Sequence, residues 1–197
     1  MTLFDAMRMR AIVSIILALA VSFAKAEELD LPKLMQLLAQ NKAGKAIFVE
    51  RKYIGIIDKP IVSSGELAFT APDKLEKRTL KPKSELLVLK GDDLTVDQPG
   101  KRRFTVSLQE HPEISAFIES IRGTLAGDRA TLEKHYTLAL TGSVEDWHLV
   151  LIPKQARLLN IISRLRIGGS QANVRTIDFD QGDGDHSEMV ITKVADQ

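Results

Sequence analysis

Short segments of alternating apolar and polar residues, separated by tight turns, constrain the fold of this chain more than any other feature. Alternation with a period of two is the pattern of a strand with one covered and one solvated face. Turns such as Gln98-Pro99-Gly100 and Gly182-Asp183-Gly184-Asp185 leave few residues between segments, and such short connections join antiparallel neighbours. We therefore expect about eleven antiparallel strands, at residues 45–57, 65–70, 75–80, 85–90, 94–96, 102–109, 136–141, 147–152, 159–167, 174–179 and 189–194.

The most regular alternation lies at residues 102–109, where Arg102, Phe104, Val106 and Leu108 share one side of the expected strand. The basic residues Lys101 to Arg103 stand at its beginning. This cluster fits a solvated strand end, and it also fits a contact with an acidic partner or with lipid headgroups.

Helices are expected at two places, before the first strand and between the sixth and seventh strands. Asp30 is a suitable N-cap and Pro32 a suitable first-turn residue for a helix at residues 31–38. A second helix begins after His111, and a short helical turn follows at residues 129–134. The second helix carries a stripe of apolar residues at helical spacing, namely Ile114, Phe117, Ile118, Ile121 and Leu125.

A single sheet of about eleven strands curls or closes, because large flat sheets are rare. The fold class is therefore α+β, mainly β, with a strongly curved sheet or barrel. The second helix is expected to lay its stripe into the mouth as a lid. The pattern alone leaves open whether the concave face of the sheet borders a cavity or a filled core. The residues expected on this face are Phe48, Leu67, Phe69, Leu87, Phe104, Val106, Leu138, Leu140, Trp147 and Leu149.

The first 26 residues have the pattern of a cleaved signal peptide. Arg8 and Arg10 precede an apolar run at residues 11–23, which is shorter than the roughly 20 residues that span a bilayer. Ala24-Lys25-Ala26 then supplies a cleavage site. We expect export to the periplasm and one mature domain at residues 27–197, and the true start is Met1, Met7 or Met9.

The residues give no support for catalysis, a metal site or a cofactor. The chain has no cysteine and no nucleophile elbow, and its four histidines do not have zinc-binding spacing. The acidic residues around Gly182 do not fit a calcium loop. The formal net charge of +1 also argues against nucleic acid as a partner. An enzyme with a lipid substrate is an alternative, and it would need a serine close in space to His135 or His148. Because no catalytic motif is present, we expect no enzyme.

Four segments, taken in order, resemble a known family. They are residues 46–52 (Ala-Ile-Phe-Val-Glu-Arg-Lys), 65–69 (Gly-Glu-Leu-Ala-Phe) followed by Pro72, 86–94 (Leu-Leu-Val-Leu-Lys-Gly-Asp-Asp-Leu) after Pro82, and 147–154 (Trp-His-Leu-Val-Leu-Ile-Pro-Lys). Their order and spacing are similar to those of the periplasmic outer-membrane lipoprotein carriers, the LolA-like proteins.

The resemblance implies an incomplete, half-closed antiparallel β-barrel with an N-terminal helix and a helical lid. It implies a carrier, expected as a monomer, that takes acyl chains from an inner-membrane transporter to an outer-membrane acceptor. Similar half-barrels also occur in regulatory modules that sense envelope stress, which is the alternative function. The cargo-binding residues would be Phe48, Leu67, Phe69, Leu75, Leu87, Phe104, Val106, Ile114, Phe117, Ile118, Ile121, Leu138, Leu140, Trp147 and Leu149.

Two positions depart from the best-studied branch of that family. Ala71 replaces an arginine that ties the lid shut there, and Leu75 replaces a bulky aromatic residue. The resemblance is therefore to a divergent member. Its cargo is left open between a lipoprotein, an acyl lipid and a pigment conjugate.

Overall fold

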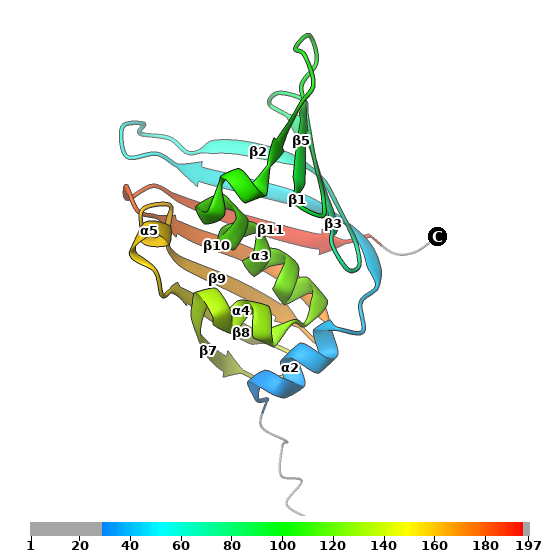
Figure 1. Ribbon diagram of the computed structural model, residues 1–197. Helices are drawn as coiled ribbons and strands as arrows, with labels where there is room; N and C mark the ends of the chain where they lie inside the picture. The colour runs from blue at the N-terminus through cyan, green and yellow to red at the C-terminus, as the bar shows by residue number, and fades with distance from the viewer. Residues whose placement is uncertain (1–28, 195–197) are drawn as a thin grey trace, which may run out of the picture.

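The computed structural model describes residues 29–194, except for the side chain of Glu113 (Figure 1). The predicted signal peptide at residues 1–26 and the three candidate start residues lie outside this range. The first described element is α2 (Leu31–Leu38), and the Asp30 side chain caps it by accepting a 2.8 Å hydrogen bond from the Lys33 amide. This confirms the expected first helix.

A single open sheet of eleven strands forms the body of the molecule. Its order is β6-β5-β4-β3-β2-β1-β11-β10-β9-β8-β7, and every neighbouring pair is antiparallel. The predicted mainly-β fold is thus confirmed. The strands are β1 (Ala43–Tyr53), β2 (Ile61–Thr70), β3 (Lys74–Lys81), β4 (Glu85–Lys90), β5 (Asp93–Asp97), β6 (Phe104–Ser107), β7 (Tyr136–Gly142), β8 (Trp147–Pro153), β9 (Ile162–Ser170), β10 (Asn173–Gln181) and β11 (His186–Lys193).

The first and last strands meet in the middle of the sheet, where Phe48 of β1 lies opposite Ile191 of β11. This leaves β6 and β7 as the two edges. The segment that joins these edges contains η1 (Leu108–Glu110), α3 (Pro112–Ala126) and α4 (Arg129–His135). Figure 1 shows α2, α3 and α4 over one face of the sheet, so the chain crosses that face to pass from edge to edge.

Gly127 makes the turn between α3 and α4 and also lets α2 approach. Its φ of 67° is left-handed, which favours glycine. A Cβ atom at this position would lie 2.1 Å from the Met35 carbonyl oxygen of α2. Conformation and packing therefore both require glycine here.

Several predicted strand boundaries are wrong, and the structure explains three of them. The segment expected at 159–167 begins with a short helix, α5 (Ala156–Leu159), because Leu158 turns into the core, and the strand starts only at Ile162. The strand expected at 102–109 is confined to β6. It ends there because Leu108 belongs to η1, where its amide donates a hydrogen bond to the Asp92 carbonyl and its side chain is buried. Residues 54–57 form a turn, closed by a 2.9 Å hydrogen bond from the Ile57 amide to the Ile54 carbonyl.

Most of the completely buried strand residues lie on β7, β8 and β9. Trp147, at the start of β8, is completely buried, and its indole N–H donates a 2.9 Å hydrogen bond to the Gln171 carbonyl. A Cβ atom at Gly169 would lie 2.3 Å from the indole ring, so this glycine lets the ring lie flat on β9. Other fully buried side chains in this region include Leu132, Leu149, Leu151, Leu165 and Ile167.

Candidate functional site

A cavity of about 420 Å³ lies between α3 and the helix-covered face of the sheet. Its size falls in the range of small-ligand sites, which is roughly 300–1,000 Å³. The helix contributes Ile114, Phe117, Ile118, Ile121 and Leu125 to its lining. The strands contribute the large apolar residues Leu67, Phe69, Leu75, Leu87, Leu89, Leu94, Ile177, Met189 and Ile191, so the wall is almost entirely hydrocarbon.

The strand register explains why these side chains converge. Phe69 of β2 lies opposite Leu75 of β3, and Leu75 lies opposite Leu89 of β4. Leu89 in turn lies opposite Leu94 of β5. Residues that face each other across antiparallel strands point to the same face of the sheet, so one transverse row becomes a continuous apolar wall.

The structure brings together eight of the residues that the sequence assigns to the cargo site. Leu67, Phe69, Leu75 and Leu87 line the cavity from the sheet. The other four line it from α3, and they are Ile114, Phe117, Ile118 and Ile121.

The remaining predicted site residues lie elsewhere. Phe48, Trp147 and Leu149 are buried in the core, and Leu138 and Leu140 pack against it. These residues fill the space under the helices rather than border the cavity. Phe104 and Val106 lie on the edge strand β6, where the side chain of Phe104 is 54% exposed.

Other lining residues escaped the sequence analysis. Leu89 follows from Leu87 by the alternation of β4 and could have been found in this way. Ile177, Met189 and Ile191 could not, because they come from strands near the end of the chain. They reach the cavity only through the pairing of β1 with β11, for which the sequence carries no local signal.

A polar cluster stands beside the cavity on the same face of the sheet. The Lys77 ammonium donates to a Glu50 carboxylate oxygen at 2.6 Å and lies 4.9 Å from the centre of the Phe48 ring. Hydroxyl groups of Ser63 and Ser187 donate to the same carboxylate at 3.2 and 3.3 Å. A partly buried charge requires such partners, because an unpaired one would be strongly destabilising. Lys77 also lines the cavity, as do Lys45 and Lys193, so the wall includes three cationic side chains.

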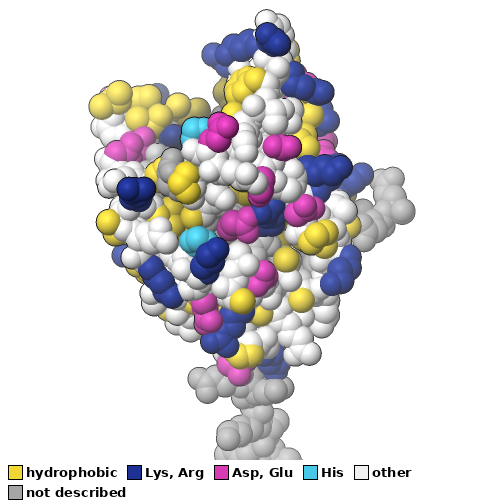
Figure 2. Space-filling model, in the orientation of Figure 1, with side chains coloured by type: hydrophobic (Ala, Val, Ile, Leu, Met, Phe, Trp, Pro, Cys, Tyr) yellow, Lys and Arg dark blue, Asp and Glu magenta, His cyan; other side chains and the backbone are white. Residues whose placement is uncertain are grey.

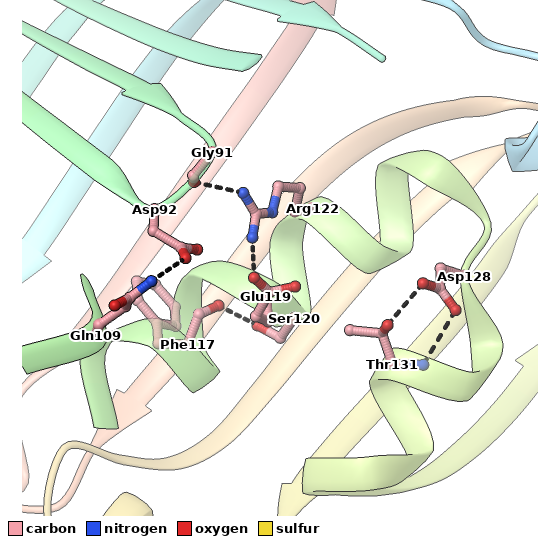
Figure 3. Close-up of polar contacts among 9 residues, drawn as sticks. All are labelled: Gly91, Asp92, Gln109, Phe117, Glu119, Ser120, Arg122, Asp128 and Thr131. Atoms are coloured by element: carbon pink, nitrogen blue, oxygen red, sulfur yellow. Dashed lines mark hydrogen bonds and ion pairs between the residues drawn. The ribbon is translucent and has the colours of Figure 1, made fainter. Parts of the chain in front are cut away.

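Polar contacts join α3 and the segment before it to the turn between β4 and β5 (Figure 3). Arg122 donates a 2.7 Å hydrogen bond to the Gly91 carbonyl and forms an ion pair with Glu119. Gln109 donates to the Asp92 carboxylate at 3.0 Å. The Arg122 side chain is only 12% exposed, so solvent screens this contact weakly. Arg122 therefore joins α3 to the sheet. This arginine lies on the helix itself, whereas the position that carries an arginine in the best-studied branch is Ala71 in this chain.

On the opposite flank, α3 is held to the packed half of the sheet. The Tyr136 hydroxyl of β7 donates a 3.2 Å hydrogen bond to the Ala116 carbonyl. Burial raises the pKa of Tyr136 to about 12, against a smaller lowering by a hydrogen bond with Ser120. The helix that follows, α4, begins at Arg129, and the side chain of Asp128 caps it. Hydrogen bonds from the Thr131 hydroxyl and amide lower the pKa of this carboxyl (Figure 3).

Within residues 29–194, no group of three or more His, Cys, Asp and Glu side chains is arranged to hold a metal ion. Burial lowers the pKa of His135, and Lys134 adds to the effect. His148 lies 3.6 Å from Asp146 on the surface. None of the described helices combines the length and apolar character needed to cross a membrane.

Two solved structures are similar to this chain at low sequence identity. A LolA superfamily protein from Nitrosomonas europaea is 12% identical over 85% of this chain and 92% of its own, with a TM-score of 0.43. The MucA/MucB complex of Pseudomonas aeruginosa is 10% identical over 86% of this chain, with a TM-score of 0.45, and the similarity spans 59% of the matched chain. No curated protein shows significant sequence similarity.

A family profile gives the decisive comparison. The profile described as outer membrane lipoprotein carrier protein LolA-like matches residues 23–197, which includes the whole of the described structure. This match confirms the resemblance noted in the sequence. The chain belongs to the LolA-like family of outer membrane lipoprotein carrier proteins.

Proposed function

We propose that this protein is a periplasmic carrier that shields acyl chains of lipoproteins or related lipid-like molecules in the cavity beneath α3. The observation that carries this proposal is the apolar cavity of about 420 Å³, lined from the helix and from the sheet. Burying an acyl chain gains about 0.8 kcal/mol per methylene group, so such a wall binds cargo without any chemistry. Membership of the family supports delivery from an inner-membrane transporter to an outer-membrane acceptor.

In this proposal α3 is a lid that moves when cargo is taken up and released. Its apolar stripe forms one wall of the cavity, so displacement of α3 would open the site along its length. The contact between Arg122 and the Gly91 carbonyl would have to break during this movement. Leucine, isoleucine and methionine side chains can repack around chains of different length, which suits a carrier that must also release its load.

The test uses Phe117→Asp, which places a charge in the cavity wall. The exported protein is purified and analysed by native mass spectrometry, followed by extraction of lipids. We expect the wild type to carry an acyl lipid or lipoprotein and the variant to carry none. Phe104→Asp is the matched control, because this phenylalanine is exposed on β6 outside the cavity, and it should retain the cargo.

Phe117 also packs against Phe179, with ring centres 5.6 Å apart, so a second variant guards against simple unfolding. Leu87→Trp fills the cavity from β4 without adding a charge and should also exclude cargo. Circular dichroism establishes that each variant is folded. Retention of cargo by both folded variants would contradict the carrier. A wild type that holds no lipid and excludes fluorescent fatty acids would contradict the carrier as well. The alternative function, a regulatory binding module, would then be favoured.

A further inference from the structure

Three turns project from the same end of the sheet. Strands β1 to β6 follow one another in sequence, and each is antiparallel to the next. The β1–β2, β3–β4 and β5–β6 turns must therefore lie at one end of these strands. These turns contain residues 54–60, 82–84 and 98–103, and we call them together the turn end.

The β1–β2 turn presents bulky apolar side chains to solvent. Ile56 is 94% exposed, and Ile57 and Ile61 are 47% and 44% exposed. The Gly55 amide donates a 3.0 Å hydrogen bond to the Asp185 side chain, which links this turn to the neighbouring β10–β11 turn. Figure 2 shows the apolar patch at the upper left, over the tip of this hairpin. Clustered apolar exposure of this kind marks an interaction site.

The other two turns are basic. Lys81 and Lys83 flank the β3–β4 turn, and Lys101 and Arg102 extend from the β5–β6 turn, all of them exposed. Arg103 is engaged in an ion pair with Asp97 at 2.7 Å. Residues 54–60, 81–84 and 98–103 together contain six basic side chains and one acidic side chain. Figure 2 shows the basic groups at the top, on a projection separate from the apolar patch.

We propose that the turn end docks on the surface of a bilayer that contains anionic phospholipid. Ile56 and Ile57 would enter the boundary between headgroups and acyl chains, and the lysines and arginine of the other turns would contact lipid phosphates. Peripheral proteins bind membranes by this combination of apolar insertion and attraction to anionic headgroups. The basic cluster at Lys101 to Arg103, which the sequence left unassigned, thereby acquires a partner.

The shape of the turn end favours a lipid surface over a folded protein. Its apolar and basic groups stand on separate projecting turns, with a hollow between the projections (Figure 2). A protein partner would have to match this relief, whereas fluid lipid headgroups adapt to it. The acidic β10–β11 turn adjoins the isoleucines and carries Asp183 and Asp185. It weakens the attraction to anionic lipid, which favours reversible docking.

The test is sedimentation with vesicles of phosphatidylcholine and phosphatidylglycerol (70:30) and with vesicles of phosphatidylcholine alone. We expect the wild type to bind the anionic vesicles and to dissociate as salt is raised. The double variant Ile56→Ser, Ile57→Ser should bind at least about tenfold more weakly. Lys101→Gln with Arg102→Gln should also weaken binding, by roughly tenfold. All variants begin at the same residue as the wild type, so a difference in vesicle binding reports on the substituted turn residues.

Ile47→Ser is the matched control, because Ile47 is comparably exposed, on β1, but lies away from the turn end. It should bind like the wild type. The proposal fails if the wild type leaves anionic vesicles unbound, in which case a protein partner would be the alternative. It also fails if the isoleucine variant binds unchanged, or if both vesicle types bind equally well.

A spectroscopic measurement provides a second test that does not require a loss of binding. The single tryptophan, Trp147, is completely buried, and the strand register places it at the opposite end of the sheet from the turn end. Its emission should therefore stay constant. Ile56→Trp places a second indole at the tip. Its emission should shift to shorter wavelength when anionic vesicles are added, and an unchanged spectrum in protein that sediments with vesicles would overturn the proposal. Neither test depends on cargo, so each is independent of the carrier function.

Discussion

The two halves of the sheet are built from the same kind of strand, yet one half is packed and the other borders a cavity. On β8 and β9 the inward side chains, such as Leu149 and Leu165, are completely buried. On β2 to β5 the inward side chains include Leu67 and Leu87, which line open space. The difference lies in the cover, because α2 and α4 lie over the first half and only one flank of α3 reaches the second (Figure 1).

This contrast shows that a strand pattern fixes which side chains face inward but does not decide what they meet there. The helix layer decides whether a row of leucines becomes a core or the wall of a cavity. If the proposed carrier function holds, stability and binding are assigned to different halves of one sheet. A packed half can hold the fold together while the other half repacks around cargo.

The largest expected effect is on stability. A leucine-to-alanine substitution in each half of the sheet compares the two losses of unfolding free energy. Leu149→Ala removes a completely buried side chain and should lower the free energy of unfolding by about 3 kcal/mol. Leu87→Ala should cost about 1 kcal/mol, because Leu87 is partly exposed and has few partner atoms on the cavity side. Urea denaturation measures both. Equal costs would mean that the cavity half is packed like the other, and the comparison would break.

A smaller effect is expected at the contact between α3 and the cavity half. Arg122→Ala removes the hydrogen bond to the Gly91 carbonyl and the ion pair with Glu119. We expect a loss of about 2 kcal/mol, since both contacts involve a charged and largely buried group. Hydrogen exchange should rise in α3 and in the β4–β5 turn but stay unchanged in β8 and β9. Uniformly faster exchange would show that α3 is part of one cooperative core and not a separate lid.

Much of the fold could be predicted from local sequence. The alternating strands, the short turns and the stripe from Ile114 to Leu125 each depend on neighbouring residues, and the structure confirms this stripe as a helix. Features that depend on distant residues could not be predicted. Nothing near Phe48 indicates that Ile191 will be its neighbour, and the regular alternation around Phe104 forms only a four-residue edge strand.

The same limit applies to the candidate site. Alternation placed Leu67, Leu87 and Leu149 on one face, which is where the structure has them. It could not separate the cavity wall from the core, because that depends on where α2 and α4 come to lie. Alternation therefore predicted the same role for Leu87, which lines the cavity, and for Leu149, which is buried in the core.

The smallest effect concerns the contact of α3 with the packed half, and it has a pH dependence of known sign. Tyr136→Phe removes the hydrogen bond to the Ala116 carbonyl and should cost about 1 kcal/mol at pH 7. The pKa of Tyr136 is raised to about 12 in the folded protein, against about 10 in an unfolded chain, so folding favours the protonated hydroxyl. The stability that this provides is complete below pH 10 and is lost as the pH rises from 10 to 12. Thermal unfolding across this range should therefore show a steeper alkaline decline for the wild type than for Tyr136→Phe. Parallel declines would mean that Tyr136 is reached by solvent, and that α3 is loosely held on both flanks.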